Sequence, residues 1–255
     1  MSTVIAVTNQ KGGVGKTTTA INVAFCLAKM GKKTLLIDLD PQGNATSGLA
    51  FDKQELKKTM TDVMLDDAKL EKIIQITKFK NLSLAPTTAY LANAEVELSK
   101  VKGRFTRLKD ATIAARGTFD YIIVDNPPSL GLLTVNGLIA ADYILLPVQT
   151  EFYALEGVSQ LLESMKLVKK AMNPDLDLLG VVPTMVDART TLSVQVLEEI
   201  QKFFGSKVFE TFVPRNVRLA EAPSHGVPVG VYDRFSKGAK AYKALTKEIV
   251  KRVEQ

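Results

Sequence analysis

The sequence predicts an α/β fold: a single domain with a doubly wound, mostly parallel sheet of about seven or eight strands flanked by helices. Two patterns carry this prediction. Short apolar runs without polar alternation, such as 4–7 and 121–124, are typical of strands covered on both faces. These runs alternate with longer stretches of helical periodicity. The 255 residues, 46% of them apolar, suffice for one large core, and we find no repeat or linker that divides residues 1–255.

The N-terminal half begins with the strand 4–7, a glycine-rich turn and a helix from about Thr17 to Met30. Gly31 should end that helix, because glycine adopts the left-handed conformation of a helix C-terminus without strain. The apolar run 34–37 predicts a second buried strand. The following segments are less regular, with short helices and a connection at 51–81, a strand at 82–84 and one or two helices at 89–116.

The C-terminal half shows the same alternation more clearly. Apolar runs predict strands at 121–125, 143–146, 178–185 and 208–213. A long amphipathic helix is expected from about Ala154 to Met172, where Asn173 and Pro174 should stop it. The last helix is expected at 236–253.

Composition narrows the possible locations and partners. No apolar run approaches the roughly 18 residues of a membrane span, and residues 1–5 lack the basic and apolar regions of a secretory signal. The only cysteine, Cys26, cannot form an internal disulfide, as is usual in a reducing compartment. We therefore expect a cytoplasmic protein. The net charge of +6 permits a polyanionic partner but is also common in proteins that are merely soluble.

The strongest motif lies between a predicted strand and a predicted helix, and reads Asn9-Gln10-Lys11-Gly12-Gly13-Val14-Gly15-Lys16-Thr17-Thr18. Glycines let backbone N–H groups turn toward a phosphate, and the helix N-terminus adds a positive dipole end. Residues 11–18 should therefore bind the phosphates of ATP, with Lys16 at the β- and γ-phosphates and Thr17 on Mg²⁺. The usual glycine five residues before Gly15 is Gln10 here, and a second lysine, Lys11, stands at the mouth of this variant loop.

Acidic residues end two predicted strands, at the edge of the sheet where open α/β folds bind ligands. Asp125 follows an apolar run, as does a Walker B aspartate that holds Mg²⁺ directly or through water. Asp38 and Asp40 follow the run 34–37. With a strand period of two, Asp38 is either structural or near Mg²⁺, and the sequence leaves this open.

Together these residues resemble the deviant Walker A ATPases, the group of ParA/Soj, MinD, nitrogenase iron protein and the arsenite and tail-anchor ATPases. The resemblance implies catalytic roles for Lys11, Lys16 and Asp40: Lys11 reaches the nucleotide of a second subunit, and Asp40 orients or activates the attacking water. A second cation is valuable in such a closed site, since unit charges about 4 Å apart interact by about 4 kcal/mol at an effective dielectric constant of 20. The chain departs from the group at Asn126, where cysteine or threonine is usual.

Four further segments are similar to chromosomal ParA/Soj proteins in particular, at 40–46, 127–131, 153–157 and 214–226. The last segment implies that Pro214 and Asn216 flank the adenine. A nitrogenase iron protein would need two cysteines per subunit, whereas Cys26 is alone. A MinD-like membrane switch would need large apolar anchors in a C-terminal amphipathic helix, and 245–255 contains neither Trp nor Phe.

Basic residues provide a candidate DNA-binding surface. Five lysines recur at intervals of three or four along one face of the last predicted helix: Lys237, Lys240, Lys243, Lys247 and Lys251. The resemblance also implies that the loops of Arg189 and Arg218 lie on the DNA-facing side of a dimer. A solvated basic face is the plainer interpretation. No base-reading motif is evident, so binding should be to phosphates, largely regardless of sequence.

The sequence therefore predicts a nucleoid-associated partition switch that uses ATP and Mg²⁺. An ATP-bound homodimer would bind non-specific double-stranded DNA, and hydrolysis would release it. The resemblance implies a ParB-type centromere-binding protein that stimulates hydrolysis, and no membrane partner is expected. Three alternatives remain: an ATPase that positions another cargo on the nucleoid, a MinD-like membrane-cycling ATPase, and a small-molecule ligase or synthetase on the same fold.

Overall fold

The computed structural model describes residues 2–66, 68–152, 154–155 and 158–254. Its strands are β1 (Thr3–Val7), β2 (Thr34–Asp38), β3 (Gln75–Ile76), β4 (Leu82–Ala85), β5 (Tyr121–Asp125), β6 (Tyr143–Gln149) and β7 (Asp177–Thr184). Its helices are α1 (Lys16–Lys29), α2 (Asn44–Gly48), α3 (Met60–Leu65), α4 (Leu91–Leu98), α5 (Arg107–Ala115), α6 (Leu132–Ala140), α7 (Val158–Ala171), α8 (Thr191–Phe204), α9 (Val217–Glu221), α10 (Val229–Tyr232) and α11 (Lys237–Val253). Short 3₁₀ turns lie at Leu70–Lys72, Gly205–Lys207 and Ala222–His225.

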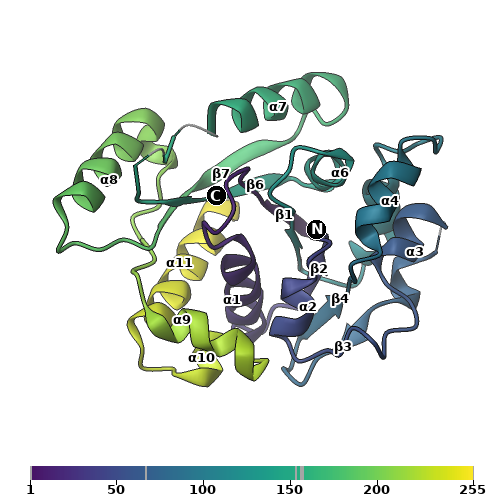
Figure 1. Ribbon diagram of the computed structural model, residues 1–255, viewed down its shortest axis with the longest axis horizontal. Coiled ribbons are helices and arrows are strands. Elements are labelled where there is room, and N and C mark those ends of the chain that lie inside the picture. Colours follow the sequence, from purple (N-terminus) through teal and green to yellow (C-terminus); the bar gives the residue numbers. More distant parts are fainter. Residues whose placement is uncertain (1, 67, 153, 156–157, 255) are drawn as a thin grey trace.

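The described strands form one seven-stranded sheet in the order β3-β4-β2-β5-β1-β6-β7. All neighbouring strands are parallel except β3 and β4. The predicted doubly wound, mostly parallel sheet is thus confirmed. Its centre is the most useful part for function, because β1 lies between β5 and β6, and β5 lies between β1 and β2 (Figure 1). The carboxyl ends of β1, β2 and β5 therefore meet at one edge.

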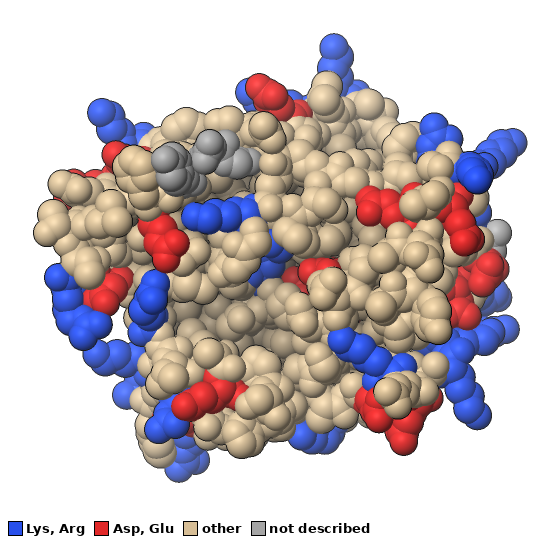
Figure 2. Space-filling view, viewed as in Figure 1, with Lys and Arg blue, Asp and Glu red and all other residues tan. Residues whose placement is uncertain are grey.

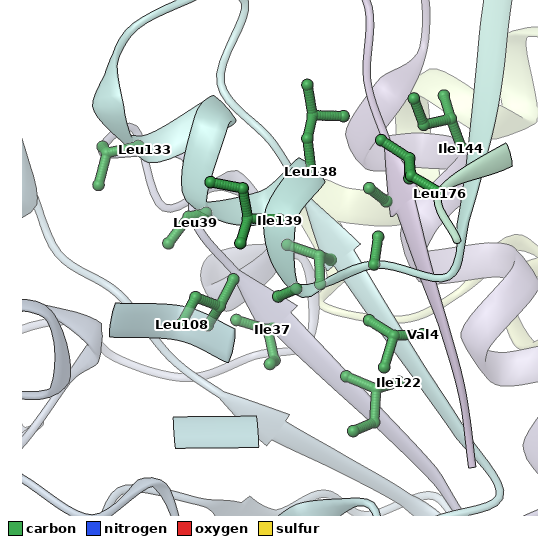
Figure 3. Close-up of a cluster of buried hydrophobic side chains, with 14 of the residues drawn as sticks. Val4, Ile37, Leu39, Leu108, Ile122, Leu133, Leu138, Ile139, Ile144 and Leu176 are labelled. Atoms are coloured by element: carbon green, nitrogen blue, oxygen red, sulfur yellow. The ribbon is translucent and has the colours of Figure 1, made fainter. Parts of the chain in front are cut away.

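Helices cover both faces of this sheet (Figure 1). Residues of α3 to α8 pack on one face, and residues of α1, α2, α10 and α11 pack on the other. Alternate residues of β1 divide between these two cores: Val4 faces the first and Ile5 the second, as the two-residue period of a strand requires. Figure 3 shows part of the first core, with Ile37 of β2 beside Leu108 of α5.

One predicted strand is wrong. The segment 208–213 runs beside β7 but makes only isolated bridges in that region, and no strand forms there. The amides of Glu210 and Thr211 donate to the side-chain carboxylate of Glu248 on α11, at 3.0 and 3.1 Å. A side chain from a helix thus takes the donors that a strand ladder would have used, which the local apolar pattern could not reveal.

Two smaller differences concern segments with weak periodicity. Within 51–81 the structure adds β3, which pairs antiparallel with β4. Two residues are too few to show a strand period. The helix predicted from about Ala154 begins at Val158 among the described residues, and Tyr153, Glu156 and Gly157 lie outside them. The range 89–116 contains two helices, α4 and α5.

Candidate functional site

The loop between β1 and α1 is anchored by its first residues. Asn9 is buried, donates from its side chain to the carbonyl of Pro147 on β6 (2.7 Å), and accepts the amide of Lys11 (3.0 Å). Gly13 and Gly15 have φ angles of 75° and 90°, in the left-handed region that favours glycine. Apart from the residues adjacent in the chain, no described residue comes within 4 Å of the place that a Cβ would take at either glycine. The loop thus faces open space in which phosphates fit.

Lys16, the first residue of α1, is a buried cation with 7% of its surface exposed. Its ammonium group donates to the carbonyl of Lys11 across the loop, at 3.0 Å. Burial lowers the pKa of Lys16, and the charges of Asp125 and Asp40 oppose that shift. Since a buried charge needs compensation, Lys16 is suited to an anionic ligand such as a phosphate.

Two carboxylates lie at the same edge of the sheet. The register places Asp125 beside Val7 on one side and beside Asp38 on the other, and both aspartates are fully buried. Burial raises the pKa of Asp38 to about 6. Burial, and then the charge of Asp38, raises the pKa of Asp125 well above its ordinary value. Such a pair is unfavourable by itself and is typical of a functional site.

Asp38, at the end of β2, and Asp40, in the turn after it, make different hydrogen bonds. One oxygen of Asp38 accepts both the amide and the hydroxyl of Thr46 in α2, each at 2.7 Å. Asp40 is nearly buried, and its side chain accepts the amide of Gln42 at 3.0 Å. Asp38 therefore holds α2 against the sheet, while Asp40 stands on the turn between them. Of the two roles that the sequence left open for Asp38, the structure supports the structural one, and a place near Mg²⁺ stays a prediction that its register beside Asp125 allows.

The remaining oxygens suit a divalent cation. The second oxygen of Asp38 and both oxygens of Asp125 are buried, and none accepts a well-formed hydrogen bond from the described residues. The Thr17 hydroxyl faces Asp125 and acts to lower its pKa. Mg²⁺ prefers such oxygens and usually adds water and phosphate ligands to one or two from the protein. Among the described residues no three acidic, His or Cys side chains form a metal cluster alone. Thr17 and Asp125 would thus hold Mg²⁺ together with bound phosphates.

A second hollow, of about 340 Å³, adjoins the loop and has mainly apolar walls. Gly15 and Thr18 line it from the loop, and Pro214 and Asn216 line it from the segment before α9. The Asn216 side chain also accepts the amide of Arg218 at 3.0 Å, which caps α9 and fixes this wall. The structure therefore brings the two residues predicted at adenine next to the phosphate loop.

The other loop residues differ in their exposure to solvent. Gly12 and Gly13 are exposed, Val14 is buried, and the half-buried ones are Lys11, Gly15, Thr17 and Thr18. Sequence reasoning missed Thr184, the last residue of β7, and Met185, which follows it; both line the second hollow. A strand end carries no sequence signal that tells whether it faces a ligand. Asn9 could have been found, because Asn often accepts a backbone hydrogen bond from two residues further on.

Asn126, where the chain departs from the deviant Walker A pattern, is fully buried behind Asp125. Its side-chain N–H groups approach the carbonyls of Val7 (3.3 Å) and Val124 (3.4 Å). Its side-chain oxygen points at Gly137 of α6, where a Cβ would collide with it. Asn126 thus joins the ends of β1 and β5, and in this side-chain conformation it leaves no room for a Cβ at Gly137.

Comparison with known proteins decides between the families that share such a loop. A family model described as an AAA domain matches residues 2–178. Sporulation initiation inhibitor protein Soj from Bacillus subtilis (strain 168) is 54% identical over 249 residues, which cover 98% of each chain. Chromosome partitioning protein ParA from Myxococcus xanthus (strain DK1622) is 49% identical and covers 98% of this chain and 88% of that protein. This chain belongs to the ParA/Soj family.

Members of the ParA/Soj family are P-loop ATPases, and the resemblance expected from the sequence is confirmed. The fold is shared more widely. Cobyrinic acid a,c-diamide synthase from Mycobacterium smegmatis, solved with an ATP analog and magnesium, has a TM-score of 0.88 and 37% identity, covering 100% of this chain and 97% of that one. The two ParA/Soj relatives are more similar to this chain in sequence, and the Myxococcus xanthus protein is named for chromosome partitioning.

The basic residues predicted at the DNA surface of this ParA/Soj chain are exposed, but the two arginines have acidic neighbours. Arg189 binds Asp187 in its own loop (2.7 Å) and holds the pKa of that carboxyl well below its ordinary value. Arg218 binds Glu221 (2.8 Å) and lies 3.5 Å from Asp233. Figure 2 shows basic and acidic side chains side by side at the left of the molecule, where Figure 1 places α8, α9 and α11.

The structure groups only some of these cations. Arg189 and Lys237 line one hollow of about 620 Å³, together with Arg215, which the sequence did not single out. The five lysines of α11 are all exposed, but at about 1.5 Å per residue Lys247 and Lys251 lie about 15 and 21 Å along the helix from Lys237. The group of cations at the start of α11 is thus distinct from those near its end.

The opposite face of α11 is apolar and is covered by the ParA/Soj fold itself. Tyr242, Leu245 and Ile249 are buried, and the Tyr242 hydroxyl is 3.0 Å from that of Thr19 in α1. These residues are therefore not available as membrane anchors in this conformation. In the described part of the chain no helix combines the length and apolarity needed to cross a membrane.

Proposed function

We propose that this protein is a cytoplasmic, nucleoid-associated partition ATPase that cycles between monomer and DNA-bound homodimer. The observation that carries the proposal is the set of buried, incompletely compensated ionisable groups at one sheet edge. Lys16, Asp38 and Asp125 all lie beneath an open phosphate loop, and their charges lack full compensation from the described residues. Bound ATP and Mg²⁺ would supply that compensation. Membership of the ParA/Soj family supports the partition role.

Each residue at this edge has a role that its position supports. Lys16 would bind the β- and γ-phosphates, and Thr17 and Asp125 would hold Mg²⁺, which neutralises phosphate charge when bound. Asp40 lies at the rim on a turn fixed by its own hydrogen bond to Gln42, so it can orient water toward the γ-phosphate. Lys11 stands half-buried at the loop mouth, where it would reach the nucleotide of a second subunit.

The basic surface would bind the DNA backbone through Arg189, Arg218, Lys237, Lys240, Lys243 and Lys247. Contacts with phosphates carry no sequence preference. A dimer presents two such surfaces to one duplex, so contacts that are too weak singly become sufficient together. ATP-dependent dimerisation would therefore also switch DNA binding. A ParB-type centromere-binding protein would act as the partner that stimulates hydrolysis and ends the cycle.

The test is to measure sedimentation and binding to two unrelated duplexes with ATP, with ADP and without nucleotide. We expect a dimer and DNA binding only with ATP and Mg²⁺. A protein that remains monomeric with ATP, or that binds DNA equally with ADP, contradicts the proposed cycle. Adding a ParB-type protein then separates the cargo alternatives, because its stimulation of hydrolysis is expected for chromosome partitioning and not for another cargo.

A further inference from the structure

A line of buried hydroxyl groups connects the phosphate loop with the loop of Arg189. The Thr184 hydroxyl, at the end of β7, donates to the carbonyl of Val14 (2.8 Å). The Thr184 carbonyl accepts the amide of Thr150, which follows β6 (3.1 Å). The Thr150 hydroxyl lies 2.7 Å from that of Ser193 on α8, and Ser193 accepts the amide of Asp187 (3.1 Å). The three hydroxyl residues are only 2–4% exposed.

The geometry allows the donors in this line to point the same way. Ser193 accepts from the amide of Asp187, so its own proton is available to Thr150. The Thr150 hydroxyl in turn approaches the Thr184 carbonyl at 3.5 Å. Aligned hydrogen bonds in a buried environment polarise one another, and removal of one leaves its neighbours unsatisfied. The line therefore gives the phosphate loop a physical connection to the loop of Arg189.

A strained residue lies in the middle of the connection. Met185 has a φ angle of 53°, which is uncommon for a residue other than glycine and persists only where the surroundings enforce it. On one side Thr184 is tied to the phosphate loop. On the other, Val186 donates to Val213 and accepts from Arg215, both at 3.1 Å. Met185 also lines the hollow beside the loop, so a ligand there touches the strained point directly.

We propose that the hydroxyl pair of Thr150 and Ser193 sets the position of the 186–190 loop according to the nucleotide bound, so that Arg189 is presented to DNA only in the ATP state. The DNA part of this inference rests on the proposed function. Neither residue lines the nucleotide hollow, so both are positioning residues that act through Thr184 and the Asp187 amide. Arg189 follows, because its own amide and side chain are bonded to Asp187.

The test compares two substitutions at one position. Thr150→Val keeps the side-chain shape and removes the hydroxyl, whereas Thr150→Ser keeps the hydroxyl. Amide hydrogen exchange of residues 186–193 is measured with ATP and with ADP, at concentrations where sedimentation shows monomer. The parent protein and Thr150→Ser should show a difference in protection between the ATP and ADP states. In Thr150→Val this difference should be at least about fivefold smaller, because fivefold is the lower end of ordinary coupling between sites. ATP affinity should be the same in all three.

Ser193→Ala tests the other end of the pair and carries the test if Thr150→Val does not fold. The double variant should lose no more than either single variant, since both remove one link. Equal nucleotide-dependent protection in Thr150→Val and the parent, or equal loss in Thr150→Ser and Thr150→Val, overturns the inference. DNA affinity separates it from the proposed function. If the protein binds DNA only with ATP but Thr150→Val keeps the parent's nucleotide-dependent exchange, only the role of the hydroxyl pair is rejected. If exchange of the 186–190 loop depends on nucleotide through Thr150 but the protein does not bind DNA, only the DNA role is rejected.

Discussion

The nucleotide site and the basic surface both gather charged residues, but they hold them in opposite ways. At the nucleotide site Lys16, Asp38 and Asp125 are buried, and several of their polar atoms lack partners among the described residues. At the basic surface Arg189 and Arg218 are exposed and bound to acidic neighbours. Burial of an uncompensated charge is costly, so it persists only where a ligand or function requires it. Exposed ion pairs contribute little and carry little information about ligands.

The sharpest test of this contrast is Lys16→Ala. The substitution removes a buried cation at the phosphate loop, so ATP affinity should fall at least about 100-fold, about 2.7 kcal/mol, as for a charged partner lost from a buried site. Dimerisation and DNA binding should be lost as a consequence. Equilibrium binding of a fluorescent ATP analogue measures the effect directly. ATP affinity within about threefold of the parent would show that the buried charge serves folding alone.

Lys11→Ala is the matched substitution within the same loop. Lys11 is half-buried at the mouth, and its backbone carbonyl rather than its side chain contacts Lys16. We therefore expect ATP binding to remain within a few-fold of the parent, whereas ATP-dependent dimerisation is lost. Sedimentation with ATP and Mg²⁺ distinguishes the two lysines. Normal dimerisation of Lys11→Ala would reject the role across the subunit interface.

Asp40→Asn tests the chemistry without disturbing the turn, because an amide oxygen can still accept the Gln42 amide. Loss of the water-orienting carboxylate should lower the hydrolysis rate about 10²- to 10⁴-fold. The variant should still bind ATP and accumulate as a DNA-bound dimer. Single-turnover hydrolysis and DNA retention are the measurements. Hydrolysis at the parent rate would remove Asp40 from the mechanism.

Asp38→Asn gives a smaller effect with a defined pH dependence. The pKa of Asp38 is about 6 in the fold against an ordinary 3.8, so ionisation costs stability fully above pH 6, and that cost disappears as pH falls toward 4. Without nucleotide and Mg²⁺, Asp38→Asn should therefore be more stable than the parent by about 3 kcal/mol at pH 7.5 and equally stable near pH 4. Chemical denaturation at several pH values measures this. An advantage that grows toward low pH has the wrong sign and rejects the explanation.

The same contrast explains what the sequence could predict. Asp125 and the phosphate loop were identifiable because strand ends and glycine spacing determine where they lie, and the register of β1, β2 and β5 brings them together. The segment 208–213 was predicted wrongly because its donors go to Glu248, a partner distant in sequence. Thr150 and Ser193 have no local pattern either. The roles of the site residues and the division of 1–255 as one domain remain predictions.

Substitutions at the basic surface should give the smallest effects. They are also the results that could most easily contradict the contrast between the buried nucleotide site and the exposed basic surface. If an ATP-bound dimer neutralises about six phosphates, log affinity should fall against log salt with a slope near −5. Arg189→Ala and Arg218→Ala should each remove two contacts per dimer and flatten that slope by about 2, while dimerisation is kept. Charge reversal along Lys237–Lys251 should give a similar but weaker loss. Lys109→Ala, an exposed lysine on α5, is the control and should leave the slope unchanged.

Asp187→Asn provides the decisive companion to Arg189→Ala. Asp187 holds the Arg189 guanidinium with two hydrogen bonds, at 2.8 and 2.7 Å, and its negative charge would lie beside the DNA. If Arg189 binds a phosphate, it must give up this partner, so removing the carboxylate charge should raise affinity about two- to fivefold, a gain typical of an exposed ion pair. The slope against salt should steepen, and two unrelated duplexes should respond equally. The loop should keep its form, because the Asn side-chain oxygen can still accept the Arg189 amide and the backbone carbonyl of residue 187 still accepts the Thr190 hydroxyl. Unchanged affinity and slope in both Asp187→Asn and Arg189→Ala would leave Arg189 as a solvated charge neutralised by its neighbour.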